Sequence, residues 1–334
     1  MRRVVVGLLV TLVACGKREP DDRPTKAPRV PVAQPAEPAA RCDSPGGHAC
    51  AGDDVIECGA DGAPGVTVQS CKTGCKRGSC IDSCETKGVE LIYVVDTTHN
   101  LWSFDPTKLP GDPFHLVGWL ACDPSSSPFS MAVDRQGVAW VLYENGRVFR
   151  VSIIDGHCSA AGVTPDDAPQ TFGMGFVSDG PNATTEKLFV AANDDATRVL
   201  ATLDTTRSTP RWESIGVIKA KQTRNPELTG TGEGKLFSYF PEAPRGFVQE
   251  LDGASGKAVG ARFNLGPTSG TVRAYAFAHW GGVFYIFATD DDGSAVHAIH
   301  RKNGKYELVL KDLPQHIVGA GVSTCAPQLE RAPD

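Results

Sequence analysis

The stretch FSMAVDRQGVAWVLY, residues 129–143, indicates the fold of this chain. Its apolar anchor Met131 stands six residues before Gly137, and a run rich in aromatic and β-branched residues follows the glycine. Two short apolar runs around a glycine turn predict a pair of antiparallel strands. The pattern recurs with anchors at Met174, Leu228 and Tyr275, and the successive spacings are 43, 54 and 47 residues. Repeats of this length are typical of four-stranded propeller blades.

The two ends of residues 85–326 fit together in this scheme. The first repeat begins at VELIYVVD, residues 89–96, and lacks an innermost strand, whereas HIVGAGVS, residues 316–323, aligns with an innermost strand that has no successor. Pairing these two segments would close a ring and remove the free sheet edges at its seam. The sequence therefore predicts an all-β fold, a five-bladed β-propeller of four-stranded blades whose terminal strands share one blade. Six blades would need a repeat that is not visible.

Residues 131–151, MAVDRQGVAWVLYENGRVFRV, resemble NHL and lactonase-like propeller repeats. The match is good over this repeat and loose over the others. The resemblance implies the propeller fold, and it implies no chemistry because propellers carry many unrelated functions.

The N-terminus reads as an export signal. Two arginines precede an apolar run, residues 4–14, that is shorter than the roughly 20 residues needed to span a bilayer. LVAC, residues 12–15, looks like a bacterial lipobox, which makes residues 1–14 a lipoprotein signal peptide and Cys15 the lipidated residue. The alternative is an ordinary secretory signal with a chance cysteine. Gly16 follows instead of aspartate, and in enteric bacteria this favours the outer membrane.

Residues 15–41 are proline-rich, carry mixed charges and lack aromatic residues, so they predict a disordered tether. The formal net charge is −6, and it becomes about −8 when the two arginines of the signal are removed. This acidic balance argues against a nucleic-acid partner, and it leaves the N-terminal lipid as the only membrane contact. The whole layout resembles cysteine-rich surface lipoproteins of myxobacterial type, which implies a lipid-anchored location at the outer membrane or cell surface.

Residues 42–84 contain seven cysteines and too few apolar residues for a core. Two short strands are predicted in DDVIEC and GVTVQSC, residues 53–58 and 65–71. Export favours a disulfide-rich module. Zinc is the competing interpretation, but the spacings lack the usual C-x2-C pair.

Ten cysteines remain after Cys15, and an even number suits complete pairing. Cys325 follows the terminal strand and Cys84 precedes its expected partner, so the two should lie at the same end of one blade and form a disulfide. Subtraction then pairs Cys122 with Cys158. Three further bonds are expected among six cysteines of the module: Cys42, Cys50, Cys58, Cys71, Cys75 and Cys80. Residues 327–334 are predicted to form a disordered tail.

Alternation along the innermost strands predicts which side chains face the axis. One such position is always small, and its members are Ala132, Gly175, Thr229, Ala276 and Gly319. Positions of the same parity nearer the strand starts carry polar residues, which predict a ligand-binding channel entrance: Ser130, Thr171, Asn225, Glu227 and Gln315. This set holds one carboxylate, and glycoside hydrolysis generally needs two. No catalytic residue, metal ligand or cofactor is assigned.

Two functions remain, besides a plugged channel with no ligand. The first is a non-catalytic propeller that binds an extracellular or periplasmic glycan, peptide or protein. The second is a secreted hydrolase or lactonase acting at the channel mouth. A second carboxylate or a metal at the entrance would favour the enzyme, whereas neutral polar groups with exposed aromatic residues would favour binding. TDDDGS, residues 289–294, resembles the start of a calcium loop but lacks the later ligands, and a solvated turn is the simpler interpretation.

Overall fold

The computed structural model describes most of the chain after the predicted tether. The described residues are Cys42, 48–52, 54–70, 75–76, 79–80, Cys84, 86–163, 169–181, 183–193, 198–205, 210–218, 224–242, 245–266 and 271–329. The predicted signal, Cys15 and the tether lie outside them.

The cysteine-rich segment forms small sheets. Strands β1 (His48–Ala51), β2 (Asp54–Cys58) and β3 (Pro64–Ser70) pair in that order, and β4 (Cys75–Lys76) pairs with β5 (Ser79–Cys80). Disulfides join Cys42 to Cys58 and Cys50 to Cys75, so these four sulfurs are not available as zinc ligands. Cys71 lies outside the described residues, and so does the third bond expected in this segment.

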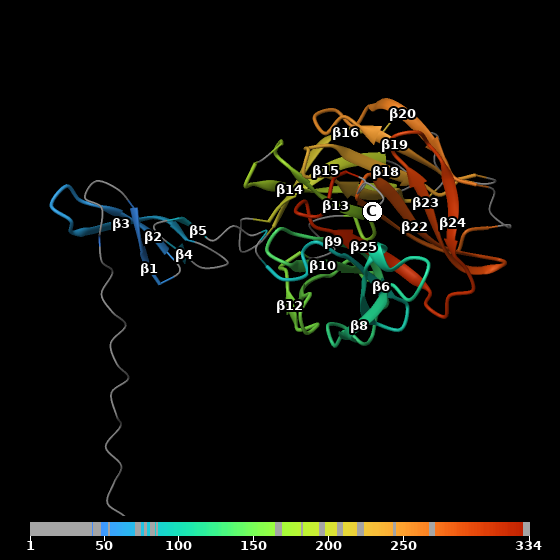
Figure 1. Cartoon of the computed structure of the whole chain (residues 1–334), viewed down its shortest axis with the longest axis horizontal. Coiled ribbons are helices and arrows are strands. Elements are labelled where there is room, and N and C mark those ends of the chain that lie inside the picture. Colours follow the sequence, from blue (N-terminus) through green and yellow to red (C-terminus); the bar gives the residue numbers. More distant parts are fainter. Residues whose placement is uncertain are drawn as a thin grey trace, which may run out of the picture. The chain divides into compact units, whose positions relative to one another are not determined.

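Five four-stranded antiparallel sheets follow, and they surround a common axis in Figure 1. From the innermost strand outward, the first is β25 (Ile317–Val322), β6 (Ile92–Asp96), β7 (Asn100–Phe104) and β8 (Phe114–Trp119). The second is β9 (Pro128–Val133), β10 (Val138–Tyr143), β11 (Val148–Ser152) and β12 (Cys158–Ala160). The third is β13 (Gly173–Ser178), β14 (Glu186–Asn193), β15 (Arg198–Asp204) and β16 (Arg211–Val217).

The fourth sheet is β17 (Glu227–Gly230), β18 (Leu236–Phe240), β19 (Phe247–Leu251) and β20 (Ala258–Asn264). The fifth is β21 (Ala274–Trp280), β22 (Val283–Asp290), β23 (Gly293–His300) and β24 (Tyr306–Leu310). A short 3-10 helix, Pro106–Lys108, joins β7 to β8, and the described residues contain no α-helix. The predicted all-β class is confirmed.

The innermost strands contact one another in a closed cycle: β25 with β9, β9 with β13, β13 with β17, β17 with β21, and β21 with β25. An apolar cluster fills each of the five spaces between neighbouring sheets. In the space between the fifth and first sheets, for example, Phe104 packs edge-on against Phe287 with ring centroids 5.2 Å apart. Burial of one face of every sheet against its neighbour is the architecture of a β-propeller.

The two chain ends share the first sheet, as the sequence predicted. β25 pairs antiparallel with β6, with Gly321 opposite Tyr93 and Val322 opposite Ile92. The Cys84–Cys325 disulfide, with its Cα atoms 5.3 Å apart, links the segments that flank these two strands. The chain therefore closes the sheet with both backbone hydrogen bonds and a covalent bond.

An aspartate organises the turn after β9. The Oδ1 atom of Asp134 accepts hydrogen bonds from the N–H groups of Gln136 and Val138, and its Oδ2 atom accepts one from the Trp140 indole. Gly137 has a φ of 76°, which is readily adopted only by glycine and costs other residues energy. This explains why the glycine recurs six residues after each anchor in the sequence pattern.

Candidate functional site

The ring of innermost strands has two ends, which differ in composition. We call the end at which these strands begin the leading end, and the end at which they turn into the next strand the trailing end. The five residues predicted to bind a ligand belong to the leading end.

Ser130 and Glu227 meet across the ring. The Ser130 hydroxyl donates to Glu227 Oε2 at 3.0 Å, although the two strands, β9 and β17, are both neighbours of β13. Gly173 of β13 contributes to this, because a Cβ atom there would lie 2.0 Å from the Pro226 carbonyl oxygen. The absence of a side chain lets β13 and β17 approach closely.

Both side chains are buried, with 0% of Ser130 and 1% of Glu227 exposed. They therefore lie below the surface of the leading end, because the strand starts pack more tightly than alternation alone implies, and ligand binding by these residues at the channel entrance stays a prediction. Burial raises the pKa of the Glu227 carboxyl well above its ordinary value, and the hydrogen bond from Ser130 only partly opposes this effect. Glu227 is therefore a carboxyl group inside the leading end that retains its proton more readily than an exposed glutamate.

Thr171 and Asn225 lie nearer to solvent, and both are half-buried. The Asn225 side-chain amide donates to Thr171 Oγ1 at 2.9 Å. The phenol of Tyr275 donates to the Asn225 backbone carbonyl at 2.7 Å. The Arg224 guanidinium lies 4.8 Å from the centroid of the Tyr275 ring. These contacts tie one side of the rim into a rigid polar cluster.

Gln315 is the fifth predicted residue. It is half-buried, and its Oε1 atom is buried without a hydrogen-bond partner among the described residues. Buried polar atoms are nearly always paired in native structures, so an orphan acceptor needs an explanation such as water or a ligand. The structure thus joins Ser130 to Glu227 and Thr171 to Asn225, and it leaves Gln315 apart from both pairs.

The row of small residues forms the next layer inward. A Cβ atom on Gly319 would lie 2.9 Å from the backbone of Ser130, and one on Gly175 would lie 3.0 Å from the backbone of Leu228. Thr229 Oγ1 accepts a hydrogen bond from the backbone N–H of His279 at 3.1 Å. At this depth the innermost strands are in contact with one another, which explains the requirement for small side chains.

The C-terminal segment covers the trailing end. The backbone N–H of Gly281 donates to the Pro327 carbonyl at 2.7 Å, and that of Gly232 donates to Gln328 Oε1 at 3.0 Å. Pro327 and Gln328, which belong to the predicted disordered tail of residues 327–334, thus make hydrogen bonds to the ring. Residues 330–334 lie outside the described residues.

A buried polar network lies beneath this segment. Thr324 Oγ1 donates to Glu186 Oε2 at 2.7 Å and accepts a hydrogen bond from Arg135 Nη1 at 3.2 Å. The backbone N–H of Arg135 donates to Glu186 Oε1 at 2.7 Å. Burial raises the pKa of Glu186 to about 7, although both hydrogen bonds act to lower it.

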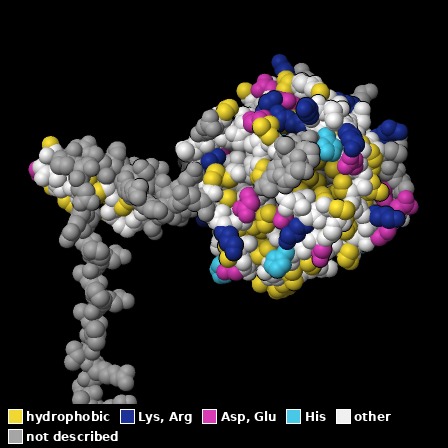
Figure 2. Space-filling view, in the orientation of Figure 1, with side chains coloured by type: hydrophobic (Ala, Val, Ile, Leu, Met, Phe, Trp, Pro, Cys, Tyr) yellow, Lys and Arg dark blue, Asp and Glu magenta, His cyan; other side chains and the backbone are white. Residues whose placement is uncertain are grey.

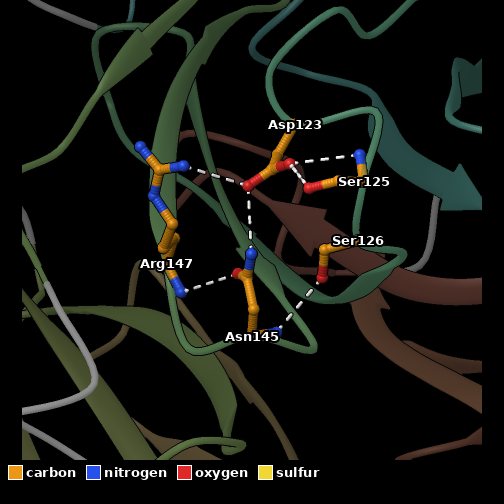
Figure 3. Close-up of polar contacts among 5 residues, drawn as sticks. All are labelled: Asp123, Ser125, Ser126, Asn145 and Arg147. Atoms are coloured by element: carbon orange, nitrogen blue, oxygen red, sulfur yellow. Dashed lines mark hydrogen bonds and ion pairs between the residues drawn. The ribbon is translucent and has the colours of Figure 1, made fainter.

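Sequence reasoning missed a polar cluster around Asp123, which Figure 3 shows between the loop before β9 and the turn after β10. Asp123 accepts hydrogen bonds from the hydroxyl of Ser125 at 2.6 Å, the amide of Asn145 at 3.0 Å and Arg147 Nη1 at 3.1 Å. These bonds, that from Ser125 first, lower the pKa of Asp123 to about 2. The cluster is satisfied internally and holds two loops of the leading end in place. Asn145 and Arg147 lie 22 and 24 positions after Asp123, so no local motif indicates the contact between the two loops.

Two further features of the leading end were also missed. Trp119, at the end of β8, exposes 55% of its surface, and its ring lies 6.1 Å from that of His99. Glu242, which follows β18, is near enough to Tyr275 to raise the pKa of its phenol, although burial of the phenol has the larger effect. Glu242 is therefore a carboxyl group that, like Glu227, lies near the phenol of Tyr275 at this end. Among the described residues, no group of three or more His, Cys, Asp or Glu side chains is arranged to hold a metal ion.

Comparison with known proteins gives structural likeness only. The chain matches no family model and no curated protein. It is similar to a chain of the mitotic checkpoint complex, with 14% identity, a TM-score of 0.36, and coverage of 65% of this chain and 60% of that one. It is also similar to the Dos1 propeller, with 14% identity, a TM-score of 0.35, and coverage of 72% and 59%.

A third similar structure is a TolB-like protein from Agrobacterium tumefaciens, with 11% identity, a TM-score of 0.37, and coverage of 66% of this chain and 70% of that one. The chain spans less than two thirds of the first two proteins. Such similarities are too low to argue for a function or a blade number, so the fold description rests on the strand pairing itself.

Proposed function

We propose that this chain is a lipid-anchored protein of the bacterial cell envelope whose propeller binds a ligand at the leading end of the ring without transforming it. The observation that carries the binding proposal is the orphan acceptor of Gln315, which lies at the same end of the ring as the neutral Thr171–Asn225 pair but is not in contact with it. A ligand with several hydroxyl groups could donate to Gln315 and exchange hydrogen bonds with the other two. We therefore favour a glycan over a peptide or protein ligand.

We infer that the five four-stranded sheets are the five blades of this propeller. The closed cycle of contacts among β9, β13, β17, β21 and β25 supports five, because each innermost strand has two neighbours in it. The turn motif of residues 131–151 remains similar to NHL and lactonase-like repeats. The similarity supports the blade interpretation and no particular chemistry.

The envelope location rests on the sequence LVAC at residues 12–15 and on the disulfides of the described chain, which are typical of exported proteins. In the part of the chain that the structure describes, no helix is long and apolar enough to cross a membrane. The Cys15→Ser variant should therefore leave the membrane fraction or keep its first fourteen residues. Membrane association together with normal processing of that variant would contradict the lipid anchor.

Figure 2 shows the face of the ring on which the chain ends, which is the trailing end. Basic and acidic side chains are interspersed there, and neither sign forms the large continuous patch that steering of a highly charged polymer requires. At the leading end, the exposed ring of Trp119 offers an apolar surface of the kind that stacks on sugar rings.

The test is a glycan-binding screen on the Cys15→Ser protein, with peptide and metal arms. Asn225→Ala and Gln315→Ala should each weaken binding of a selected glycan by about tenfold, the loss expected when a buried partner is left unpaired. Asn303→Ala is the matched control, because Asn303 is an exposed amide in the turn between β23 and β24. Equal binding by all three variants would place the ligand elsewhere.

A hydrolase remains the second candidate because Glu227 and Glu242 both act on the phenol of Tyr275. A raised pKa is what a general acid requires, and Glu227 has one. Turnover of a bound glycan or lactone that is lost in Glu227→Gln, with binding retained, would favour the enzyme over the binding protein.

A further inference from the structure

The disulfide between Cys84 and Cys325 has an unusual neighbour. Arg135 Nη2 lies 3.1 Å from the sulfur of Cys84, and only 7% of the arginine is exposed. The same guanidinium donates to Thr324, one residue before Cys325. A cation is thus held against one specific sulfur of the bond by a buried network.

The second disulfide of the propeller provides a comparison. Cys122 and Cys158 are half-buried, as are Cys84 and Cys325, so access to the two bonds is similar. Among the described residues, no guanidinium or ammonium group contacts the Cys122–Cys158 bond. The closest polar contact of Cys158 is the carbonyl oxygen of Gly156 at 3.6 Å.

A neighbouring cation stabilises a thiolate and lowers the pKa of the cysteine. In thiol–disulfide exchange, a sulfur that forms a more stable thiolate leaves faster. Arg135 therefore makes Cys84 the better leaving group of its pair, and it directs an attacking thiolate to Cys325. We propose that Cys84–Cys325 is an exchangeable redox latch, opened by a dithiol reductant, that holds the C-terminal segment over the trailing end.

The exchange balances with a dithiol as the reductant. Its first thiolate attacks Cys325 Sγ and forms a mixed disulfide, and the electron pair of the broken bond leaves on Cys84 beside Arg135. The second thiolate then attacks the dithiol's own sulfur in the mixed disulfide and releases Cys325. The dithiol is oxidised to a disulfide, and the two cysteines together gain two electrons and two protons.

Opening the bond frees the segment that follows β25. Residues 326–329 would then be held by the buried side chain of Ala326 and by the hydrogen bonds that the backbone N–H groups of Gly232 and Gly281 donate. Their loss would uncover the end of the ring opposite the proposed ligand site. The latch is independent of the ligand proposal, since it involves no residue of the leading end.

The first measurement needs no variant. The native full-length protein is treated with increasing dithiothreitol, free thiols are alkylated at intervals, and each disulfide is quantified by peptide mass spectrometry. Cys84–Cys325 should be reduced faster than Cys122–Cys158, on the order of tenfold. Equal rates, or faster reduction of Cys122–Cys158, would overturn the proposal.

Variants then assign the cause. Arg135→Gln should remove the preference, whereas Arg135→Lys, which retains the charge, should keep most of it. Thr324→Val, which alters the network but not the cation, is the matched control and should keep the preference. If Cys84–Cys325 is reduced in Arg135→Gln with the same preference as in wild type, the cation is not responsible and the proposal fails.

Hydrogen exchange tests the consequence. After selective reduction, the amides of Gly232 and Gly281 should exchange at least tenfold faster, while amides of β10 and β22 keep their protection. Unchanged exchange at both glycines would show that the bond does not hold the segment, and it would contradict the latch.

Discussion

The two ends of the ring are formed by the same five innermost strands, but they are held together by different means. At the trailing end, a disulfide, a buried Arg135–Thr324–Glu186 network and a covering C-terminal segment connect strands that are distant in sequence. At the leading end, the side-chain connections among Ser130, Glu227, Thr171 and Asn225 are single hydrogen bonds, and Gln315 retains an orphan acceptor. Because the disulfide and the buried network close the ring at the trailing end, closure does not depend on the residues of the leading end. Those residues are therefore available for the proposed ligand binding.

The largest expected effect comes from removing the closure. Cys84→Ser with Cys325→Ser opens a loop with a sequence separation of 241, whereas Cys122→Ser with Cys158→Ser opens one of 36. Either pair should lower the free energy of unfolding by about 2–5 kcal/mol, and chain entropy makes the first loss larger by roughly 1.5–2 kcal/mol. Urea unfolding of both variants measures the difference. If the variant without Cys84–Cys325 loses no more free energy of unfolding than the variant without Cys122–Cys158, the Cys84–Cys325 bond contributes little to the stability of the ring.

A moderate effect is expected from Gly173→Ala at the leading end. The added Cβ would meet the Pro226 carbonyl oxygen, a backbone atom that cannot rotate away, so strands β13 and β17 must separate. Overpacking of this kind costs about 1–3 kcal/mol. Gly118→Ala in β8 is the control, because its Cβ would have an ordinary 3.5 Å contact with Asp155 O. Equal unfolding midpoints for the two variants would contradict the close approach of the innermost strands.

The sequence predicted those parts of the fold that repeat. The spacing of Met131 and Gly137 recurs, and the unmatched strands at residues 89–96 and 316–323 had one consistent pairing, which β6 and β25 adopt. How deeply each side chain is buried at the leading end could not be predicted in the same way. Alternation gives the face of Glu227 but not its distance from solvent, which depends on how far Gly173 lets neighbouring strands approach.

Contacts between distant side chains were also beyond the sequence. Nothing local to Arg135 indicates that it meets Cys84, Thr324 and Glu186, since these residues come from four separate segments. The Asp123 cluster likewise depends on two loops brought together by the sheet between them. A repeat in the sequence predicts how the strands connect and pair, whereas these side-chain networks depend on how neighbouring sheets are positioned against each other.

The smallest expected effect is a difference in the pH dependence of stability between two buried carboxyl groups, Glu227 at the leading end and Glu186 at the trailing end. Glu186 has two hydrogen-bond donors and a pKa of about 7, whereas Glu227 has one donor and a pKa well above its ordinary value of 4.5. For either group, a folded-state pKa above the unfolded value means that its stabilising contribution is complete at pH below about 4.5. That contribution is lost as pH rises through the folded-state pKa.

Glu227→Gln keeps a neutral side chain of the same shape at every pH and should therefore be spared this loss. Relative to wild type, its free energy of unfolding should increase as pH rises from 5 to 9, by on the order of 1 kcal/mol or more, because a buried charge with one donor is poorly solvated. For Glu186→Gln the increase in the free energy of unfolding should be smaller and nearly complete by pH 8. The same substitution at the exposed Glu213 is the control for the loss of a surface carboxyl group. Urea unfolding at four pH values separates these outcomes. A Glu227→Gln difference that stays constant from pH 5 to 9 would mean that the carboxyl is solvated in solution, and the leading end would then be open at the depth where the structure shows it closed.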